Sequence, residues 1–352
     1  MSAINLIKRS LIVMVAMVGL LSSCQRYDRF FFVKNKGAIM PVKVSGKAAS
    51  EKYIILLPGG PSGDGLIYST VFPVFRKQIE PHYKMVYYDQ RGAGNCQGVY
   101  DSSSLHLQQL GEDLDKLVRT IKSRDSTARV FLLGYSYGGT LGLHYLLEPE
   151  HQKHIDGFIS IAGAFDRKQQ AENQQKLTEF LLDKWVQDGA IDNYEAMKAG
   201  YDCGQAPDIA KCKMDSIATV QWVTDKFAEV QQYNRFKLSG KAALRLLRYT
   251  FFSPGNPIQS GIAEGQNGRY FQQEFNEQML SGQVAEIRVP ILLLNGRYDT
   301  NVPFFEAEAV YGNIGTPVHK KKMIILEASG HLPMITEPDQ LAESVIAFVK
   351  EN

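Results

Sequence analysis

Residues 129–143 read Arg-Val-Phe-Leu-Leu-Gly-Tyr-Ser-Tyr-Gly-Gly-Thr-Leu-Gly-Leu, and this stretch decides the fold. An apolar run typical of a buried strand leads into Gly134-Tyr135-Ser136-Tyr137-Gly138, and a segment suited to a helix follows. The glycines two positions either side of the serine allow a sharp strand-to-helix turn that exposes its hydroxyl above the sheet. The free N–H groups at the start of the helix point to the same place. The pattern predicts a nucleophile elbow, with a plain glycine-rich turn as the alternative.

The bulk composition is that of an ordinary globular protein. The 352 residues are 44% hydrophobic and 22% charged, with a formal net charge of +2, which suits one large domain or two smaller ones. No long basic stripe or acidic tail stands out, so we expect no nucleic-acid partner. No Cys/His cluster has the spacing of metal ligands, and we expect neither a metal nor a cofactor.

The N-terminus has the features of a processing signal. Lys8 and Arg9 precede the apolar run 11–21, which is too short to span a bilayer comfortably. Leu21-Ser22-Ser23-Cys24 resembles the bacterial lipobox, which implies cleavage before Cys24 and lipidation of its thiol. We therefore predict a lipoprotein signal peptide over residues 1–23 and a tether over residues 24–35. An ordinary secretory signal or an uncleaved anchor helix are the alternatives.

These features predict a location in the cell envelope, with a lipid anchor on Cys24. Gln25, rather than Asp, follows the cysteine, and by the usual bacterial sorting pattern this favours the outer membrane. In such an oxidising compartment Cys203 and Cys212 could close a small loop as a disulfide, or both could stay unpaired. Cys96 would be left over, near the expected mouth of the active site.

Six apolar, β-branched or aromatic runs look like parallel strands buried on both faces. They are Tyr53–Leu57, Lys84–Tyr88, Arg129–Leu133, Gly157–Ile161, Pro290–Leu294 and Lys322–Leu326. Helix-length segments separate most of them, which implies right-handed βαβ units. Leu105–Lys122 has apolar residues at helical spacing and is the expected crossover helix before the elbow strand.

The alternation of strands and helices stops between about residues 166 and 285. This stretch is polar, aromatic and helix-prone, and we expect helices over Gln169–Leu182, Tyr194–Ala199, Asp215–Val230 and Gly240–Tyr249. Strand and helix alternate again from residue 286. The sequence thus predicts an α/β core over residues 36–165 and 286–352 with a helical cap, residues 166–285, inserted into it.

Two strand ends after the cap carry the partners that a serine nucleophile needs. Asp299 follows the strand Pro290–Leu294, and His331 follows the strand Lys322–Leu326. A serine hydroxyl needs a base, normally histidine, and a third group that orients the base. The chain order of nucleophile, acid and base predicts a triad of Ser136, Asp299 and His331. Asp299 could instead be a turn residue, with Glu306 as the nearest substitute, and His331 an ordinary loop histidine.

An acyl-transfer enzyme also needs donors for the developing oxyanion. One is expected to be the backbone N–H of Tyr137, directly after the nucleophile. Residues 57–65, Leu-Pro-Gly-Gly-Pro-Ser-Gly-Asp-Gly, follow the first predicted strand, and Gly60 is our candidate for the second donor. Glycines let the backbone approach a substrate closely.

Together these segments resemble the α/β-hydrolase superfamily, and more narrowly its prolyl aminopeptidase (proline iminopeptidase) branch. Pro58-Gly59-Gly60-Pro61 resembles the His-Gly-Gly-Pro oxyanion motif of that branch, and Asp89-Gln90-Arg91-Gly92-Ala93-Gly94 its Asp-Gln-Arg-Gly-x-Gly turn. Gly330-His331-Leu332-Pro333 resembles its histidine loop. The resemblance implies an α/β-hydrolase fold, with a mostly parallel sheet, helices on both faces and an inserted helical cap. It covers roughly residues 50–165 and 286–350.

The chain departs from that branch in two places. Pro58 replaces the motif's histidine. Aminopeptidases of the branch bind the free α-amine of the substrate through cap carboxylates, and no cap motif here matches them residue by residue. Acids are plentiful in the cap: Glu172, Glu179, Asp183, Asp188, Glu264, Glu274 and Glu277. We interpret Asp89 and Arg91 as structural residues that hold their turn.

The sequence leaves three hypotheses of function. The first is a serine aminopeptidase that releases N-terminal residues, proline among them, from short peptides, because a capped pocket suits short substrates. The second is a carboxylic-ester hydrolase of the same fold. The third is a non-catalytic binding lipoprotein. The absence of a member of the triad would favour it, but all three members are present in the sequence.

Overall fold

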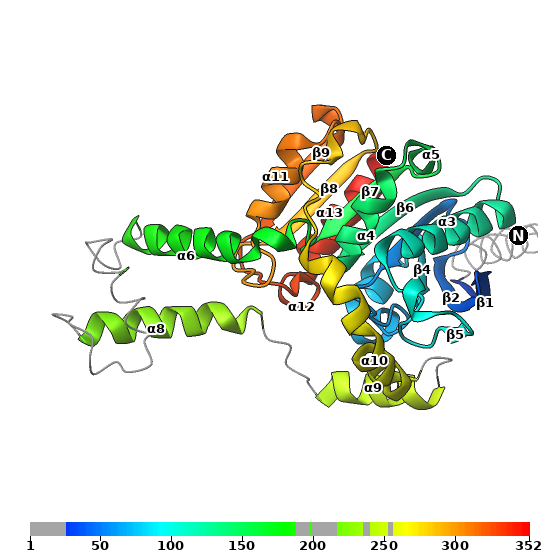
Figure 1. The fold of residues 1–352 in the computed structure, drawn as a ribbon, viewed down its shortest axis with the longest axis horizontal. Helices are drawn as coiled ribbons and strands as arrows, with labels where there is room; N and C mark the ends of the chain where they lie inside the picture. The colour runs from blue at the N-terminus through cyan, green and yellow to red at the C-terminus, as the bar shows by residue number, and fades with distance from the viewer. Residues whose placement is uncertain (1–25, 188–197, 199–216, 235–239, 253–255) are drawn as a thin grey trace, which may run out of the picture.

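The computed structural model describes residues 26–187, 198, 217–234, 240–252 and 256–352, and Figure 1 shows their arrangement. Four predicted features lie outside these residues. They are the signal peptide over residues 1–23, the lipidation site Cys24, the disulfide between Cys203 and Cys212, and nearly all of the helix Tyr194–Ala199.

The described residues contain one mixed sheet of nine strands. The strands are β1 Arg26–Asn35, β2 Ala38–Lys47, β3 Lys52–Leu57, β4 Lys84–Tyr88, β5 Gln97–Gly98, β6 Arg129–Tyr135, β7 Gly157–Ile161, β8 Ile291–Gly296 and β9 Lys321–Leu326. Their order is β1-β2-β4-β3-β6-β7-β8-β9, with β5 paired to β2. Neighbours from β4 to β9 are parallel, whereas β2 is antiparallel to both β1 and β4. All six predicted parallel strands are confirmed.

Helices cover both faces of this sheet (Figure 1), as expected for an α/β-hydrolase fold. The helices of the core are α2 Tyr68–Val71, η1 Phe75–Ile79, η2 Ser102–Ser104, α3 Leu107–Arg124, α4 Tyr137–Leu146, α5 Pro149–Gln152, η5 Val284–Glu286, α11 Phe305–Asn313, η6 Val318–Lys320, α12 Pro333–Thr336 and α13 Pro338–Glu351. Helix α3 packs beside α4 on one face, and α13 beside η1 on the other. The predicted crossover helix is therefore present as α3, displaced by two residues because His106 caps its N-terminus.

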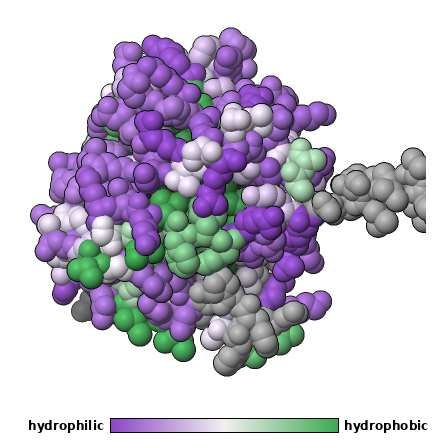
Figure 2. All heavy atoms as spheres, turned by 90° about the vertical axis from the view of Figure 1, so that its right-hand side faces the viewer, coloured by the Kyte–Doolittle hydropathy of each residue, from purple (hydrophilic) through white to green (hydrophobic). Residues whose placement is uncertain are grey.

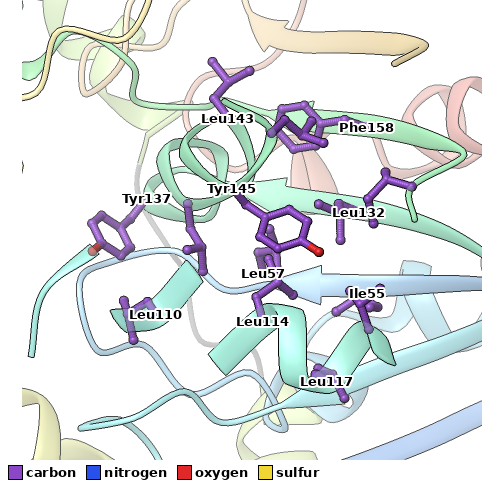
Figure 3. Packing of buried hydrophobic residues seen from close by; sticks show 14 of the residues in the cluster. Ile55, Leu57, Leu110, Leu114, Leu117, Leu132, Tyr137, Leu143, Tyr145 and Phe158 are labelled. Carbon is purple, nitrogen blue, oxygen red and sulfur yellow. The ribbon is translucent and has the colours of Figure 1, made fainter. Parts of the chain in front are cut away.

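The central strands are buried on both faces, which explains their continuous apolar runs. Ile55 and Leu57 of β3 join the cluster under α3 and α4, whereas Ile54 and Leu56 join the cluster under η1 and α13. Figure 3 shows how Leu110 and Leu114 of α3 meet the side chains of β3 in the first of these clusters. A strand with a helix layer on each side has no polar face, so its sequence does not alternate.

The predicted tether over residues 24–35 is wrong for most of its length. Arg26–Asn35 form β1, which pairs with β2 at every residue from Arg26 to Asn35. The turn between the strands consists of Lys36 and Gly37, which both have positive φ, 39° and 84°. Two left-handed residues match the right-handed twist of a hairpin, so Lys-Gly between two β-prone runs was the signal for this hairpin.

The helical insertion lies between β7 and β8. Its described helices are η3 Arg167–Gln169, α6 Gln170–Gln187, α8 Ile217–Gln232, α9 Gly240–Phe252 and α10 Pro257–Asn276. Three of the predicted cap helices correspond to α6, α8 and α9. Helix α10 was not predicted, although Asn256 caps its first turn and Pro257 occupies its first position, a pattern that favours a helix start.

The surface around β1 and β2 is shown in Figure 2. It is mostly hydrophilic, with a hydrophobic patch near its centre. Phe30 and Phe32 of β1 are among the exposed large hydrophobic residues, and their rings lie edge to face with centroids 5.3 Å apart.

Within the described ranges, we find no helix long and apolar enough to cross a membrane.

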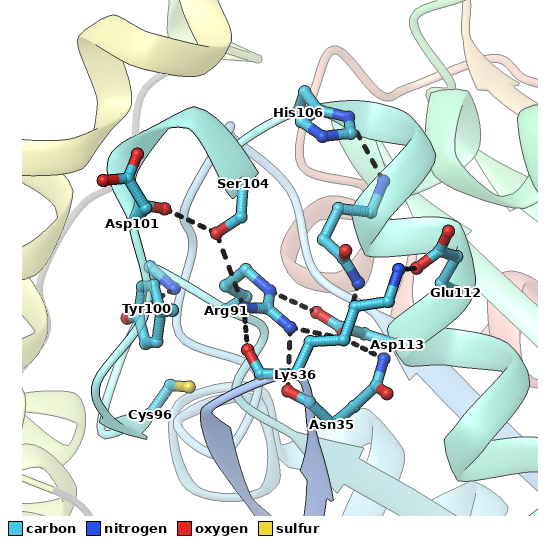
Figure 4. A network of polar contacts seen from close by, with 12 residues as sticks. Asn35, Lys36, Arg91, Cys96, Tyr100, Asp101, Ser104, His106, Glu112 and Asp113 are labelled. Carbon is cyan, nitrogen blue, oxygen red and sulfur yellow. Dashed lines mark hydrogen bonds and ion pairs between the residues drawn. The ribbon is translucent and has the colours of Figure 1, made fainter.

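A buried ion pair joins the turn after β4 to α3, beside the β1–β2 turn (Figure 4). The Arg91 guanidinium donates to both carboxylate oxygens of Asp113, at 2.8 and 2.9 Å, and the side chains are 0% and 1% exposed. Arg91 also donates to the carbonyl oxygens of Asn35 and Lys36. These bonds agree with the interpretation of Arg91 as a residue that holds its turn.

We predict that Asp113→Ala destabilises the protein by about 3–5 kcal/mol, because it leaves the Arg91 guanidinium buried without its counter-ion. The neighbouring Glu112 pairs with Lys36 on the surface and offers a matched control. Glu112→Ala should cost less than about 1 kcal/mol. Urea unfolding of the two variants checks this, and equal midpoints would contradict it.

Candidate active site

The nucleophile elbow depends on two glycines that have no room for a side chain. A Cβ on Gly138 would lie 2.0 Å from the carbonyl oxygen of Leu57 in β3, and a Cβ on Gly134 would lie 2.3 Å from that of Gly138. Ser136 between them has φ 51° and ψ −116°, a strained conformation for a residue with a side chain. The Ser136 N–H donates to Ile161 at 3.0 Å, and its carbonyl accepts from Gly139 at 2.8 Å. These bonds hold the strained residue in place.

The structure brings Ser136, His331 and Asp299 into one hydrogen-bonded chain. His331 Nε2 lies 3.1 Å from Ser136 Oγ, and His331 Nδ1 lies 2.9 Å from Asp299 Oδ2. The three residues follow β6, β9 and β8, at the carboxyl ends of parallel strands. With a proton on Nδ1, the imidazole donates to Asp299 and its Nε2 can accept the proton of the Ser136 hydroxyl.

Asp299 is completely buried, and both of its side-chain oxygens accept or face hydrogen-bond donors. Its other oxygen, Oδ1, accepts the backbone N–H groups of Asn301 at 2.9 Å and Val302 at 2.8 Å. Both carboxylate oxygens are therefore occupied, and Oδ2 is directed at the imidazole. His331 keeps 13% of its side chain exposed, and its ring lies 5.2 Å from that of Tyr135.

The glycine-rich loop after β3 lies directly against Ser136. A Cβ on Gly59 would lie 3.2 Å from Ser136 Cβ and 2.6 Å from the Tyr135 ring. The N–H of Gly59 donates to the hydroxyl of Tyr68, at 3.0 Å, so Gly59 is committed to the scaffold. Gly60 has φ 68°, and the one atom within 4 Å of the position of its missing Cβ is Glu264 Oε1. Tyr137 is the first residue of α4 and is therefore at the end where N–H groups lack helical partners.

Comparison with known proteins identifies the family. The sequence profile of the family described as serine aminopeptidase, S33, matches residues 67–251, just over half of the chain. The chain belongs to the S33 serine aminopeptidase family. It is thus a serine hydrolase with the α/β-hydrolase fold, as the motifs predicted.

Individual relatives are distant. The sequence is 24% identical to the proline iminopeptidase of Saccharolobus solfataricus over 325 residues, which covers 92% of both chains. A proline iminopeptidase from Mycobacterium smegmatis matches the fold with a TM-score of 0.61 at 14% identity, over 92% of this chain and 98% of that one. An esterase from Exiguobacterium antarcticum does so with a TM-score of 0.56 at 18% identity, over 92% and 100%. At these identities the two structures show the fold alone.

Asp64 ties the end of the glycine-rich loop to the cap of this hydrolase. Its Oδ2 accepts the hydroxyl of Ser260 in α10 at 2.7 Å and that of Tyr249 in α9 at 3.2 Å. Beneath it lies Asp89, fully buried, which accepts the backbone N–H groups of Leu66 and Asn95. The pKa of Asp89 is raised well above its ordinary value. Burial is the largest cause, and the neighbouring Asp64 carboxylate is the second. Asp89 thus holds its turn, as predicted.

The cap acids have different surroundings. Glu172 and Glu277 form surface ion pairs with Lys176 and Lys168. Glu274 accepts the N–H of Leu107 and so caps α3. Glu264 of α10, by contrast, has Oε1 4.0 Å from the position that a Cβ on Gly60 would take. This places an exposed carboxylate over the glycine-rich loop. Asp188 lies outside the described residues.

No metal site emerges from the described part of the chain, where no three His, Cys, Asp or Glu side chains are arranged to hold an ion. Cys96 is a free thiol, and burial raises its pKa to about 12, so it stays protonated at neutral pH.

Glu306, the substitute considered for Asp299, has another role. Its Oε2 accepts the backbone N–H groups of Phe165 at 2.7 Å and Asp166 at 2.9 Å, where the chain leaves the core for the cap. It is 1% exposed, and burial raises its pKa to about 7. Glu306 therefore fastens the start of the insertion rather than the imidazole.

We predict that Glu306 makes the protein less stable as the pH rises. A carboxyl whose pKa is raised from 4.5 to about 7 on folding binds more protons when folded, so its contribution is complete below pH 4.5 and is lost by about pH 7. The loss amounts to about 3 kcal/mol. Glu306→Gln should flatten the stability curve in this window, whereas Glu343→Gln, an exposed change on α13, should not. Urea unfolding from pH 4.5 to 8 tests this, and curves of equal slope would refute it.

Proposed function

We propose that the protein is a serine aminopeptidase that releases N-terminal residues, proline among them, from short peptides. The observation that carries the proposal is the hydrogen-bonded chain of Ser136, His331 and Asp299 at the carboxyl ends of three parallel strands. The family match and the 24% identity to a proline iminopeptidase support the choice of substrate class.

The proposed reaction is a two-step acyl transfer. His331 Nε2 takes the proton of the Ser136 hydroxyl while the serine oxygen bonds to the carbonyl carbon of the substrate. The backbone N–H groups of Gly60 and Tyr137 donate to the resulting oxyanion. His331 then gives its proton to the leaving nitrogen, and the C–N bond breaks. Water, deprotonated by His331, attacks the acyl-enzyme, and the acid leaves as the proton returns to Ser136.

Glu264 is our candidate for the group that binds the free α-amine. A charged amine next to the scissile carbonyl has to sit close to the oxyanion donors, and the Glu264 carboxylate lies over Gly60. An ammonium group and a carboxylate form a charge-assisted hydrogen bond, which an N-blocked peptide or a simple ester cannot form.

Hydrolysis of arylamides tests the proposal. The chain that starts after Cys24 should cleave prolyl and alanyl arylamides, and N-acetylation of these substrates should abolish cleavage. Ser136→Ala should abolish turnover without loss of the fold. Glu264→Gln should raise KM for the free amides about tenfold, which corresponds to one charge-assisted bond. Glu277→Gln makes the same charge change at a surface ion pair and should leave KM unchanged.

Two outcomes would contradict the proposal. Serine-dependent cleavage of a short-chain nitrophenyl ester without any cleavage of free amides would replace it with the ester hydrolase. Folded protein that neither turns over substrate nor reacts with a fluorophosphonate would favour the non-catalytic binding lipoprotein.

We also propose that the protein is exported and anchored to a membrane through lipid on Cys24. The support is the sequence alone: Lys8, Arg9, the apolar run 11–21 and the lipobox-like residues before Cys24. Since β1 begins at Arg26, a lipid on Cys24 would leave Gln25 as the sole linker to the sheet. Cells expressing the full chain should incorporate an alkyne fatty acid into it, and Cys24→Ala should prevent this. Labelling that is unchanged by the substitution would exclude Cys24 as the site.

A further inference from the structure

Asn234, two residues beyond α8, reaches from the cap insertion to the two loops that carry Asp299 and His331. Its Oδ1 accepts the backbone N–H of His331 at 3.0 Å and that of Thr300 at 3.4 Å. Its Nδ2 donates to the carbonyl oxygen of Tyr298 at 2.8 Å and to that of Val230 at 3.1 Å. A carboxamide has two donor hydrogens and two acceptor lone pairs, so its hydrogen-bonding capacity is fully used.

These bonds fix the backbone on both sides of Asp299 and the backbone of His331. Tyr298 and Thr300 are the two chain neighbours of Asp299, and His331 is the base itself. One rigid amide group therefore sets the spacing between the loop after β8 and the loop after β9. The side-chain distance that depends on this spacing is the 2.9 Å between His331 Nδ1 and Asp299 Oδ2.

Three further contacts show that this part of the cap is closely fitted to the loops that carry Asp299 and His331. A Cβ on Gly330 would lie 2.5 Å from Asn234 Oδ1, so the glycine before the histidine is required by the amide that occupies that space. The ring of Tyr233 stacks on that of Tyr298, with centroids 4.9 Å apart and planes at 14°. Val230 is buried in a cluster with Leu177 and Leu181 of α6 and with Phe304 of the core.

We propose that Asn234 is a positioning residue for catalysis, through which the end of α8 holds His331 and Asp299 in register with Ser136. The inference rests on the proposed catalytic roles of these three residues. An asparagine is required because the site needs an acceptor for two N–H groups and a donor for a carbonyl oxygen at once. Aspartate could accept but not donate, and its second oxygen would face the carbonyl of Tyr298.

The test compares Asn234→Ala and Asn234→Asp with Gln232→Ala, an exposed change at the end of α8. The main readout is the rate constant for labelling by a small fluorophosphonate, which depends on Ser136 and its base but needs no substrate contact with the cap. Misplacement of a catalytic group by about 1 Å costs ~10²-fold in rate. We expect Asn234→Ala to slow labelling and kcat by about this factor with KM nearly unchanged. Asn234→Asp keeps the bonds that the side chain accepts, so its labelling rate constant should lie between those of Asn234→Ala and the wild type.

The outcomes separate this inference from the proposed function. If wild-type protein is not labelled at Ser136, the proposed triad is wrong. If wild type is labelled and Asn234→Ala reacts as fast as the Gln232→Ala control, Asn234 has no positioning role. A rise in KM without a change in the labelling rate would show a role in substrate binding alone and would also overturn the proposal. Should the alanine variant fail to fold, the isosteric Asn234→Asp variant decides the question by the same labelling rate.

Discussion

The close approach of β3 to the start of α4 is the constraint on which the site depends. The backbone at Gly138 lies so near the carbonyl of Leu57 that no side chain fits, and Gly134 is confined in the same way. Only with both glycines can the chain turn within one residue from strand to helix. That turn forces Ser136 into its strained conformation, lifts its hydroxyl off the sheet and directs the first N–H groups of α4 to the same point.

The surrounding polar groups keep this geometry rigid. Asp299 is buried with one oxygen committed to two backbone N–H groups, which leaves the other for the imidazole. The hydroxyl of Tyr68 accepts the N–H of Gly59. Gly59 directly follows Pro58, which stands where the His-Gly-Gly-Pro motif has its histidine. Preorganised dipoles need no rearrangement during a reaction, so this fixed arrangement suits the proposed acyl transfer.

The helical insertion contributes more than a cover. It is joined to the α/β core through Asn234, at the loops of Asp299 and His331, and through Tyr249 and Ser260, at Asp64 of the glycine-rich loop. Glu306 fastens the chain where the insertion begins. Each of these connections is a buried or half-buried hydrogen bond. Such bonds stabilise the fold when all polar groups are paired, and loss of one partner lowers the free energy of unfolding. These hydrogen bonds therefore fix the position of the insertion relative to the loops of Asp299 and His331 and to the glycine-rich loop.

The sequence by itself determined the core: the six parallel strands, the elbow, and the positions of Ser136, Asp299 and His331 after three of those strands. These are local patterns, because a doubly covered strand reads as a continuous apolar run and a tight turn reads as glycine. It also predicted correctly that Arg91 and Asp89 hold their turns. It missed the hairpin of β1, in which Val33 is the one buried residue of the run Phe30-Phe31-Phe32-Val33, and α10, whose glycines lower its helix propensity. Tertiary structure alone decided that Asn234 meets His331 from 97 residues away, that Glu264 lies over Gly60, and that Glu306 binds the chain at Phe165. Such contacts join segments distant in sequence, and a lone asparagine or glutamate has no local pattern that distinguishes it from a solvated surface residue.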